Sequence, residues 1–303
     1  YSNQKDQRDR YRNDFGEHGE NVFSQQEKFS SLGVYALHQT EFDNGLLLRL
    51  GSRFDLNQIS TDNINQSIVL NKLNPSFGIT YNTNKKSNFF MTVGTSFETP
   101  TLNELSNNPT GGMGFNKDLE PISSLSYEYG WKGYFKSFSF EIIGYNILSS
   151  NEILPFELEE YPGKNFYTNV GETSRVGLEF NWNYFLPSTI INLSYTFSDN
   201  QFKSYELNDS QLKGNKIPGI PNQLFHLSVL YKFTKDFNLK LDYQFIGERF
   251  ADNLNLTRID PHSLLSLKFS KPFNIKRIKL TSFLGINNLL NEKYFDNIRL
   301  NAF

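Results

Sequence analysis

The sequence predicts an all-β protein, a transmembrane antiparallel β-barrel with about twelve strands, and three observations lead to this expectation. Segments of roughly ten residues alternate apolar and polar side chains, the connections between them are short and long in turn, and no segment with helical periodicity interrupts the run. Val176–Tyr184 is typical, because Val176, Leu178 and Tyr184 share one face with two aromatic residues between them. One face of such a strand suits lipid and the other suits a polar lumen.

Twelve segments along the chain carry this alternation. In order they are Ser31–Gln39, Leu46–Asp55, Asn74–Tyr81, Phe89–Phe97, Ser124–Gly133, Phe138–Leu148, Arg175–Tyr184, Ile190–Phe197, Gln223–Phe233, Asn238–Gly247, His262–Ser270 and Ile278–Leu289. Their inner faces hold charges of both signs, as with Lys240 and Asp242 between Leu239, Leu241 and Tyr243. We therefore expect a water-filled lumen, or one filled by a polar partner.

The connections sort into two kinds that alternate along the chain. The expected short turns are Phe42–Gly45, Asn82–Ser87, Tyr134–Ser137, Phe185–Thr189, Thr234–Phe237 and Lys271–Arg277. The expected long loops are Leu56–Leu73, Glu98–Ser123, Ser149–Ser174, Ser198–Asn222 and Glu248–Pro261. This alternation predicts an up-and-down barrel with periplasmic turns and external loops, whereas a soluble β-sandwich would not sort its loops so regularly.

Composition limits the alternatives. Hydrophobic residues make up 38% of the chain and aromatic residues 16%, and no stretch approaches the roughly 18 apolar residues of a transmembrane helix. Only a barrel, which pairs its backbone groups between strands, lets so polar a chain cross a membrane. A net charge of −2 argues against nucleic acid as a partner, and the lack of cysteine excludes disulfides and thiolate metal sites.

Several short motifs, in order, resemble those of TonB-dependent outer-membrane receptors. Phe97–Leu105 resembles the family's Phe-x-x-Pro-x-x-x-Glu-Leu stretch. The later matches are Asn116, Leu119 and Glu120-Pro121 (with Glu and Pro in swapped order); Glu128, Gly130 and Lys132; Asn169-Val170-Gly171 with Gly177 and Glu179; Ile217–Asn222 with Tyr231–Phe233; and Asn287–Asn291 with Tyr294. The resemblance runs from about Phe23 to the end of the chain.

This resemblance implies a 22-stranded barrel in the bacterial outer membrane, filled by an N-terminal plug domain and powered by the TonB–ExbB–ExbD complex. Residues 1–303 would be the C-terminal part of that barrel, with the plug domain, signal peptide and final strand absent. Gln25, Glu27 and Gly33 look most like the ferric-siderophore and ferric-citrate branch, so the ligand expected from the resemblance is a ferric siderophore. Receptors for cobalamin, haem or oligosaccharide share the same barrel, and fold alone does not select among them.

Aromatic and cationic residues of the long loops are the expected ligand contacts, because an iron chelate of catecholate or citrate type is anionic. The candidates are Phe115, Tyr161, Phe166, Tyr205, Arg249 and Arg258, with Tyr167 and Phe250 beside them. Each residue has an alternative role in loop packing or in an interfacial girdle.

No pattern predicts an enzyme, a cofactor site or a metal site. The four histidines, His18, His38, His226 and His262, lack metal-ligand spacing, and the acidic run Glu157–Glu160 is typical of a solvated loop. Besides the receptor, the alternatives are a passive outer-membrane channel and a soluble all-β binding protein. The passive channel would lack the Phe97–Leu105 landmark, and the soluble protein would have polar outward faces.

Overall fold

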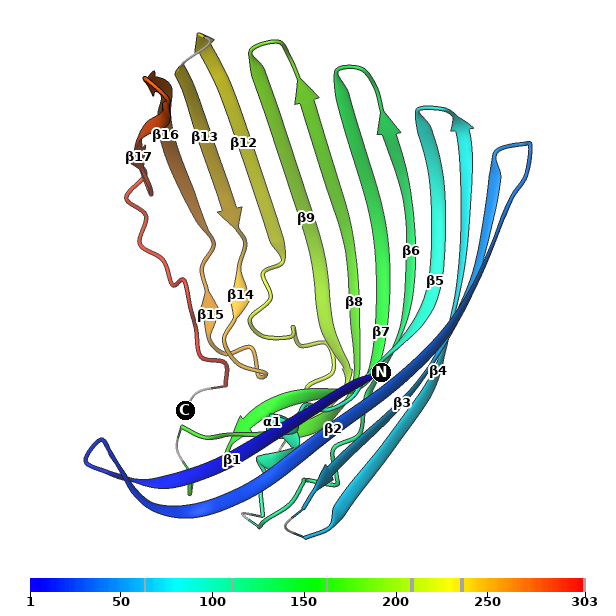
Figure 1. Ribbon diagram of the computed structural model, residues 1–303, viewed down its shortest axis with the longest axis vertical. Coiled ribbons are helices and arrows are strands. Elements are labelled where there is room, and N and C mark those ends of the chain that lie inside the picture. Colours follow the sequence, from blue (N-terminus) through cyan, green and yellow to red (C-terminus); the bar gives the residue numbers. More distant parts are fainter. Residues whose placement is uncertain (63, 111, 162, 208–209, 235–236, 302–303) are drawn as a thin grey trace.

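Antiparallel backbone pairing between neighbouring strands organises the chain. The computed structural model describes residues 1–62, 64–110, 112–161, 163–207, 210–234 and 237–301. Thirteen of its strands form one sheet, in the order β1-β2-β3-β4-β5-β6-β7-β8-β9-β12-β13-β16-β17. The sheet curves into an open part of a barrel wall, with its short turns at one end and its loops at the other (Figure 1).

The elements have these bounds: β1 Ser2–Asp14, β2 Glu17–Glu41, β3 Leu46–Thr61, β4 Gln66–Asn84, β5 Ser87–Glu98, α1 Leu102–Ser106, β6 Ile122–Tyr134, β7 Phe138–Glu157, β8 Asn165–Phe185, β9 Thr189–Ser204, β10 Glu206–Leu207, β11 Ser210–Gln211, β12 Gln223–Thr234, β13 Phe237–Ile246, β14 Arg249–Phe250, β15 Arg258–Ile259, β16 His262–Ile275 and β17 Ile278–Ile286. Two small ribbons, β10-β11 and β14-β15, lie within the loops.

All twelve predicted strands are present, but the sheet has one strand more, and several strands are longer than expected. β1 was not predicted, and β2 begins at Glu17 rather than Ser31. Most of the predicted loops Leu56–Leu73 and Ser149–Ser174 is paired strand, so those loop assignments were wrong. Alternation of polarity ends where the apolar surface ends, whereas hydrogen bonding between strands continues.

The expected long loop Glu98–Ser123 contains a helix, which corrects the expectation that no helix interrupts the strands. Helix α1 has five residues. Among the described residues, no helix has the length and hydropathy needed to cross a membrane.

The turn between β2 and β3 shows how the short connections are encoded. Gly45 has a φ of +84°, and its amide donates to the Phe42 carbonyl at 3.0 Å. A Cβ at Gly45 would lie 2.6 Å from the Asn82 carbonyl oxygen, so this position requires glycine. The predicted turn Asp43-Asn44-Gly45 is confirmed. In the turn expected at Thr234–Phe237, residues 235–236 lie outside the described part of the chain.

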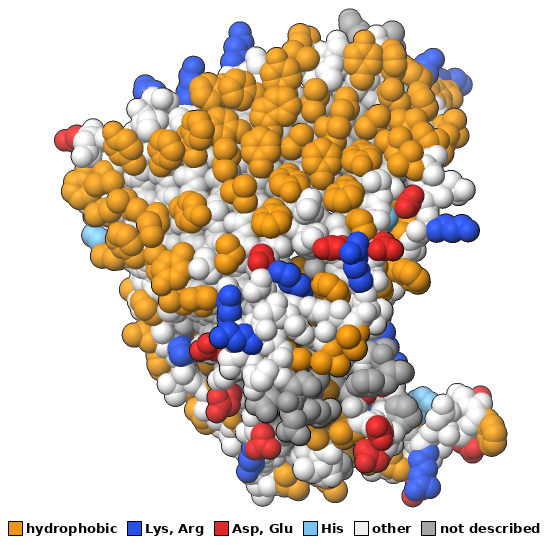
Figure 2. All heavy atoms as spheres, turned by 180° about the vertical axis from the view of Figure 1, so that it is seen from behind, with side chains coloured by type: hydrophobic (Ala, Val, Ile, Leu, Met, Phe, Trp, Pro, Cys, Tyr) orange, Lys and Arg blue, Asp and Glu red, His pale blue; other side chains and the backbone are white. Residues whose placement is uncertain are grey.

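The two faces of the sheet differ in polarity as the alternation predicted. In β13, Leu241 lies opposite Val229 and Leu267 on one face, and Asp242 lies opposite Ser228 and Ser266 on the other. Hydrophobic side chains form a broad band over the turn half of the face seen in Figure 2, and charged side chains gather toward the loop end. Such a band is typical of a surface in contact with hydrocarbon.

Aromatic side chains line the turn end of the apolar face. The rings of Phe89 and Trp131 are stacked at 5.6 Å, and Trp131 meets Phe140 edge-on at 4.6 Å. Further along the sheet, Phe237 lies 6.0 Å from Phe269. This row occupies the position of an interfacial girdle, where amphipathic and aromatic rings are favoured.

We expect Leu241→Arg to impair assembly of the complete receptor, because arginine on the lipid face near mid-bilayer costs about 2–4 kcal/mol. The measurement is the heat-modifiable fraction of the protein in isolated outer membranes. The matched control is Gln244→Arg, which places the same side chain on the inner face of the same strand. Equal assembly of the two variants would contradict the assignment of faces.

The 303 residues expressed alone should aggregate rather than insert into a membrane. Among the described strands of the sheet, β1 and β17 each have one edge without a neighbouring strand, and such edges are unfavourable in lipid. Heat-modifiable insertion of this segment by itself, tested on gels after membrane isolation, would refute the expectation.

Candidate ligand-binding site at the loop end

Several charged residues on the inner wall of the sheet form pairs. Lys132 contacts Glu141 across β6 and β7. On β13, the Lys240 ammonium lies 2.9 Å from Asp242, and the His226 Nε2 lies 3.6 Å from the same carboxylate. His226 therefore lies on the inner wall. Pairing keeps this wall polar with little net charge, which suits water or a polar partner.

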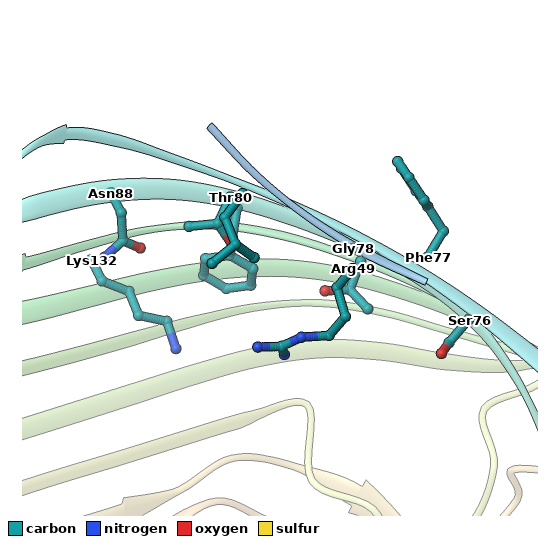
Figure 3. Close-up of a pocket in the computed structure, with 10 residues that line it drawn as sticks. Arg49, Ser76, Phe77, Gly78, Thr80, Asn88 and Lys132 are labelled. Carbon is teal, nitrogen blue, oxygen red and sulfur yellow. The ribbon is translucent and has the colours of Figure 1, made fainter. Parts of the chain in front are cut away.

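A shallow cavity of about 250 Å³ lies on this wall toward the turn end. Arg49 and Lys132 extend from it toward the interior, whereas Phe77 points the opposite way (Figure 3). Arg49 donates to the Gln39 amide oxygen at 3.0 Å, and the Lys132 ammonium lies 4.7 Å from the Phe90 ring centroid. The cavity is part of the lumen wall and lies far along the strands from the loops.

At the loop end, the Phe97–Leu105 motif builds a capped helix. Thr101 is the N-cap residue of α1, and its hydroxyl accepts a hydrogen bond from the Glu104 amide at 3.2 Å. The Glu104 carboxylate accepts from the Thr101 amide at 2.7 Å, which completes a capping box. The motif therefore specifies a local turn of helix that buries Leu105 and Ser106.

A hydrophobic cluster holds α1 and the loop after it against the sheet. Its buried members are Ile59, Leu105, Phe115 and Leu119, and the partly buried Ile68, Leu70, Leu102, Ile153 and Tyr167 are among the residues packed around it. The Gln66 side chain forms two hydrogen bonds with the backbone of Phe115. It accepts from the Phe115 amide at 2.8 Å and donates to the Phe115 carbonyl at 3.2 Å. The loop is thereby tied to β3 and β4 on one side and to the β7–β8 hairpin on the other.

A buried carboxylate ties the same helix to the first hairpin. Glu27 has no exposed surface, and its carboxylate accepts from Arg8 Nε at 2.8 Å and from Arg8 Nη2 at 3.2 Å. Gln25 Nε2 donates to the same carboxylate at 3.0 Å, and the Ser106 hydroxyl contacts it from α1. The bidentate pair with Arg8 and the further donors Gln25 and Ser106 replace the hydrogen bonds to water that the Glu27 carboxylate loses on burial.

Arg10 lies two residues after Arg8 in β1, so both side chains are on the same face of the strand. Its Nη2 donates to the Ser106 carbonyl at 2.9 Å and to Asn107 Oδ1 at 3.0 Å, and its guanidinium lies 4.6 Å from the Phe23 ring centroid. Burial lowers the pKa of Arg10, and the neighbouring charge of Arg8 lowers it further.

The tip of the β7–β8 hairpin carries a cation that lies over aromatic rings. Phe166 is fully buried. Its ring centroid lies 5.8 Å from that of Tyr161 and 6.0 Å from that of Phe156. The Lys164 ammonium lies 4.6 Å from the Phe166 centroid and 5.3 Å from that of Tyr161. Burial lowers the pKa of Lys164, and the charge of Arg10 lowers it further.

Three of the six predicted ligand contacts have buried side chains. Phe115 is 3% exposed, Phe166 is 0% exposed and Tyr205 is 9% exposed. Tyr205 packs against Phe202 at a ring distance of 5.1 Å in a second loop cluster that also contains Val170. All three side chains pack in the loop clusters, which is the alternative role named for them in the sequence analysis. By packing there, they hold the loops in place.

Tyr161 is the exposed aromatic residue of the set, at 46% of its surface. It lies at the β7–β8 tip, beside Lys164. Among the predicted aromatic contacts, it is therefore the one whose ring is open to a ligand.

The two predicted arginines lie elsewhere along the loop end. Arg249 lines a cavity of about 260 Å³ with Asp199 and Lys216, and it donates to the Phe295 carbonyl at 2.8 Å. Its Nε is buried and has no hydrogen-bond partner among the described residues. Arg258 is paired with Glu248 at 3.2 Å. The six predicted residues thus fall into separate groups rather than one site.

Sequence reasoning missed Arg8, Arg10 and Lys164. The first two lie in a polar stretch without alternation, so nothing in the pattern assigned them to a strand. A signal for Lys164 was its place between Tyr161 and Phe166. The histidines do not gather, and the described residues contain no group of three potential metal ligands.

An antiparallel barrel wall with an apolar outer band, a polar inner wall and docked loops at one end defines an outer-membrane β-barrel. The chain belongs to the TonB-dependent receptor family, because the family described as TonB dependent receptor-like, beta-barrel, matches residues 1–289. Members of this family are outer-membrane transport receptors, not enzymes, and they bind large ligands and interact with TonB.

Relatives and solved structures agree with this assignment. The chain is 26% identical over 234 residues to the vitamin B12 transporter BtuB of Vibrio vulnificus (strain CMCP6), covering 75% of this chain and 34% of BtuB. The unliganded ferric citrate transporter FecA has a TM-score of 0.75 at 18% identity, covering 94% of this chain and 43% of FecA. The siderophore receptor PiuA from Acinetobacter baumannii has a TM-score of 0.73 at 18% identity, covering 95% of this chain and 43% of PiuA. The chain therefore spans less than half the length of each.

Replacing Glu27 by alanine should release α1 from the first hairpin in the complete receptor. Arg8 would lose its carboxylate, and breaking one half of a buried ion pair typically costs about 3–5 kcal/mol. We expect hydrogen exchange at the amides of Leu105 and Asn116 to accelerate at least about tenfold, with β12 and β13 unchanged.

The control for this substitution is Glu20→Ala on the same hairpin. Glu20 and Arg12 are 3.8 Å apart and are each 73% exposed, so their pair contributes little. Unaltered exchange in Glu27→Ala, or equal acceleration in both variants, would show that the buried carboxylate does not hold the loop.

Proposed function

We propose that this chain is the C-terminal part of the barrel of an outer-membrane active-transport receptor. The receptor binds a scarce, large ligand at its loop end and imports it with energy from the TonB–ExbB–ExbD complex. The ligand class that we propose is a ferric siderophore or a related ferric chelate.

The observation that carries the proposal is the arrangement at the loop end. The β1–β2 hairpin meets α1 there through Arg8, Arg10 and Ser106. Ile153 and Tyr167 of the β7–β8 hairpin pack against the cluster that contains Leu105 of α1. In Figure 1, these three segments lie together at the end opposite to the short turns. A site assembled from several loops presents a broad surface, which suits a ligand too large for a porin channel.

The chemistry of that surface favours an anionic chelate. Lys164 lies over the exposed ring of Tyr161, and Arg10 lies at the end of α1. Arginine is well suited to carboxylate and catecholate oxygens. FecA and PiuA, whose names denote a ferric citrate transporter and a siderophore receptor, have the same fold. At 18% identity, the likeness to FecA and PiuA supports the architecture alone. The choice of ligand is supported by the cations at the loop end.

Cobalamin is the second candidate ligand, because the curated relative at 26% identity is a vitamin B12 transporter. Haem and oligosaccharides fit the same barrel class. A passive channel fits less well, because the loop after β5 is packed down by a capped helix and a buried ion pair and lies over the concave side.

The function can be tested with the complete receptor in detergent and with its deletion strain. We expect submicromolar binding of one ferric complex from a panel of ferric citrate, ferric catecholate and ferric hydroxamate complexes, haem and cobalamin. Uptake of that complex should need both the receptor and TonB.

Two results would overturn parts of this proposal. Binding of cobalamin or a glycan with no binding across the iron panel would overturn the iron assignment. Uptake that is independent of TonB and unsaturated by ligand would overturn active transport and favour a channel.

A further inference from the structure

We propose that the turn end of strands β4 to β7 binds an anionic phospholipid of the surrounding membrane. Lys85, Lys86 and Lys136 hold the phosphate of its headgroup, and the aromatic cluster beside them lies along its acyl chains. Because the short turns of outer-membrane barrels face the periplasm, this lipid belongs to the periplasmic leaflet. The surface is at the opposite end of the wall from the loops (Figure 1), so its occupancy does not depend on the ligand that the receptor transports.

Five aromatic rings form one connected cluster on the apolar face at this end. Phe89 stacks on Trp131 at 5.6 Å, and Trp131 meets Phe140 edge-on at 4.6 Å. Phe135 stacks on Phe138 at 4.6 Å and lies 6.3 Å from Phe140. Trp131 and Phe135 are each 39% exposed. Aromatic rings are favoured at the boundary between hydrocarbon and headgroups, so the cluster marks the depth at which lipid phosphates lie.

The cations come from the two turns next to this cluster. Lys85 and Lys86 form the tip of the turn between β4 and β5. Lys136 lies in the turn between β6 and β7, which is closed by a hydrogen bond of 2.8 Å from the Phe135 amide to the Phe138 carbonyl. Lys136 therefore lies between the two stacked rings in sequence, at the edge of the apolar face.

Hydrogen bonds join the two turns and fix the indole between them. The Tyr134 amide donates to the Lys86 carbonyl at 2.7 Å, which holds the end of β6 against the β4–β5 turn. Trp131 Nε1 donates to the Oγ of Ser87, the residue after Lys86, at 2.8 Å. The three cations therefore belong to one ordered edge of the wall, and the Trp131 ring is held at the same edge.

The three cations have exposed side chains and no carboxylate within 4.0 Å among the described residues. Asp43 is the one acidic residue in the described turns at this end. At the loop end, by contrast, cations are paired, as Arg8 is with Glu27 and Lys28 with Asp62. The whole chain has a net charge of −2, so the unpaired cations reflect their placement and not an excess in composition.

Unpaired cations that border an apolar band fit the headgroup of an anionic lipid. In Figure 2, Lys and Arg side chains lie along the turn-end edge of the hydrophobic band. A lysine stem can lie against hydrocarbon while its ammonium reaches the phosphate level. Each such cation near a membrane surface favours anionic over neutral lipid by about fivefold. A free phosphate ion uses the cations alone, whereas a lipid such as phosphatidylglycerol also uses the aromatic cluster and the apolar band.

The site can be tested with the complete receptor in phosphatidylcholine vesicles, by fluorescence quenching with brominated lipids. One set of vesicles contains brominated phosphatidylglycerol, and the other contains brominated phosphatidylcholine at the same mole fraction. The signal of Trp131 is the difference between the receptor and its Trp131→Phe variant. We expect phosphatidylglycerol to be enriched at Trp131 at least about fivefold over its bulk mole fraction. Added salt should reduce the enrichment.

The triple variant Lys85→Gln, Lys86→Gln and Lys136→Gln should lose this enrichment, with quenching by brominated phosphatidylcholine unchanged. The matched control is Lys276→Gln with Arg277→Gln, which removes two exposed cations from the turn between β16 and β17. It should keep the enrichment. Native mass spectrometry of co-purified phosphatidylglycerol and cardiolipin is a second measurement, and it needs no replacement of Trp131.

Three results would overturn the lipid site. The first is equal quenching by the two brominated lipids in the wild-type receptor, or enrichment that survives in the triple variant. The second is loss of enrichment on adding inorganic phosphate at an ionic strength matched with chloride, which would assign the cations to a free anion. The third is binding of polyglutamate without lipid enrichment, lost in the triple variant, which would assign the surface to an acidic protein. Ligand binding at the loop end is measured separately, so the proposed function is unaffected by each result.

Discussion

Pairing of every backbone N–H and C=O group between neighbouring strands is the constraint on which the rest of this structure depends. Inside a bilayer no water replaces a missing partner, so a polar chain can cross only as a hydrogen-bonded wall. Thirteen strands in sequential order pair with their neighbours, and the outer edges of β1 and β17 end the described sheet. Because pairing is local to neighbours, one face is free to be apolar and the other to carry paired charges such as Lys240 and Asp242.

Beyond the apolar band, a different interaction takes over. Glu27 is fully buried and joins Arg8, Gln25 and Ser106, so an ionic contact orders the chain at the loop end. The Phe97–Leu105 motif has its physical meaning here. It makes a short capped helix whose polar side engages the first hairpin and whose Leu105 joins the loop core.

The strands that face lipid could be predicted, and the loop-end surface could not. Leu239, Leu241 and Tyr243 alternate with polar residues because one side of β13 meets hydrocarbon, and that requirement is written into neighbouring positions. Arg8 and Arg10 belong to a strand that is polar on both faces, so no period marked them. Phe115, Phe166 and Tyr205 were candidates by residue type, but burial in loop clusters gives them a packing role.

The sequence by itself determined the barrel class, the polarity of each strand face and the tight turn at Asp43-Asn44-Gly45, because all three depend on residues close together in the chain. Only the tertiary structure decided which loop residues share a site. Arg10 and Ser106 are far apart in sequence and meet because the extended β1–β2 hairpin reaches α1. The pairing that extends that hairpin is made by backbone groups, and these are the same for every residue except proline.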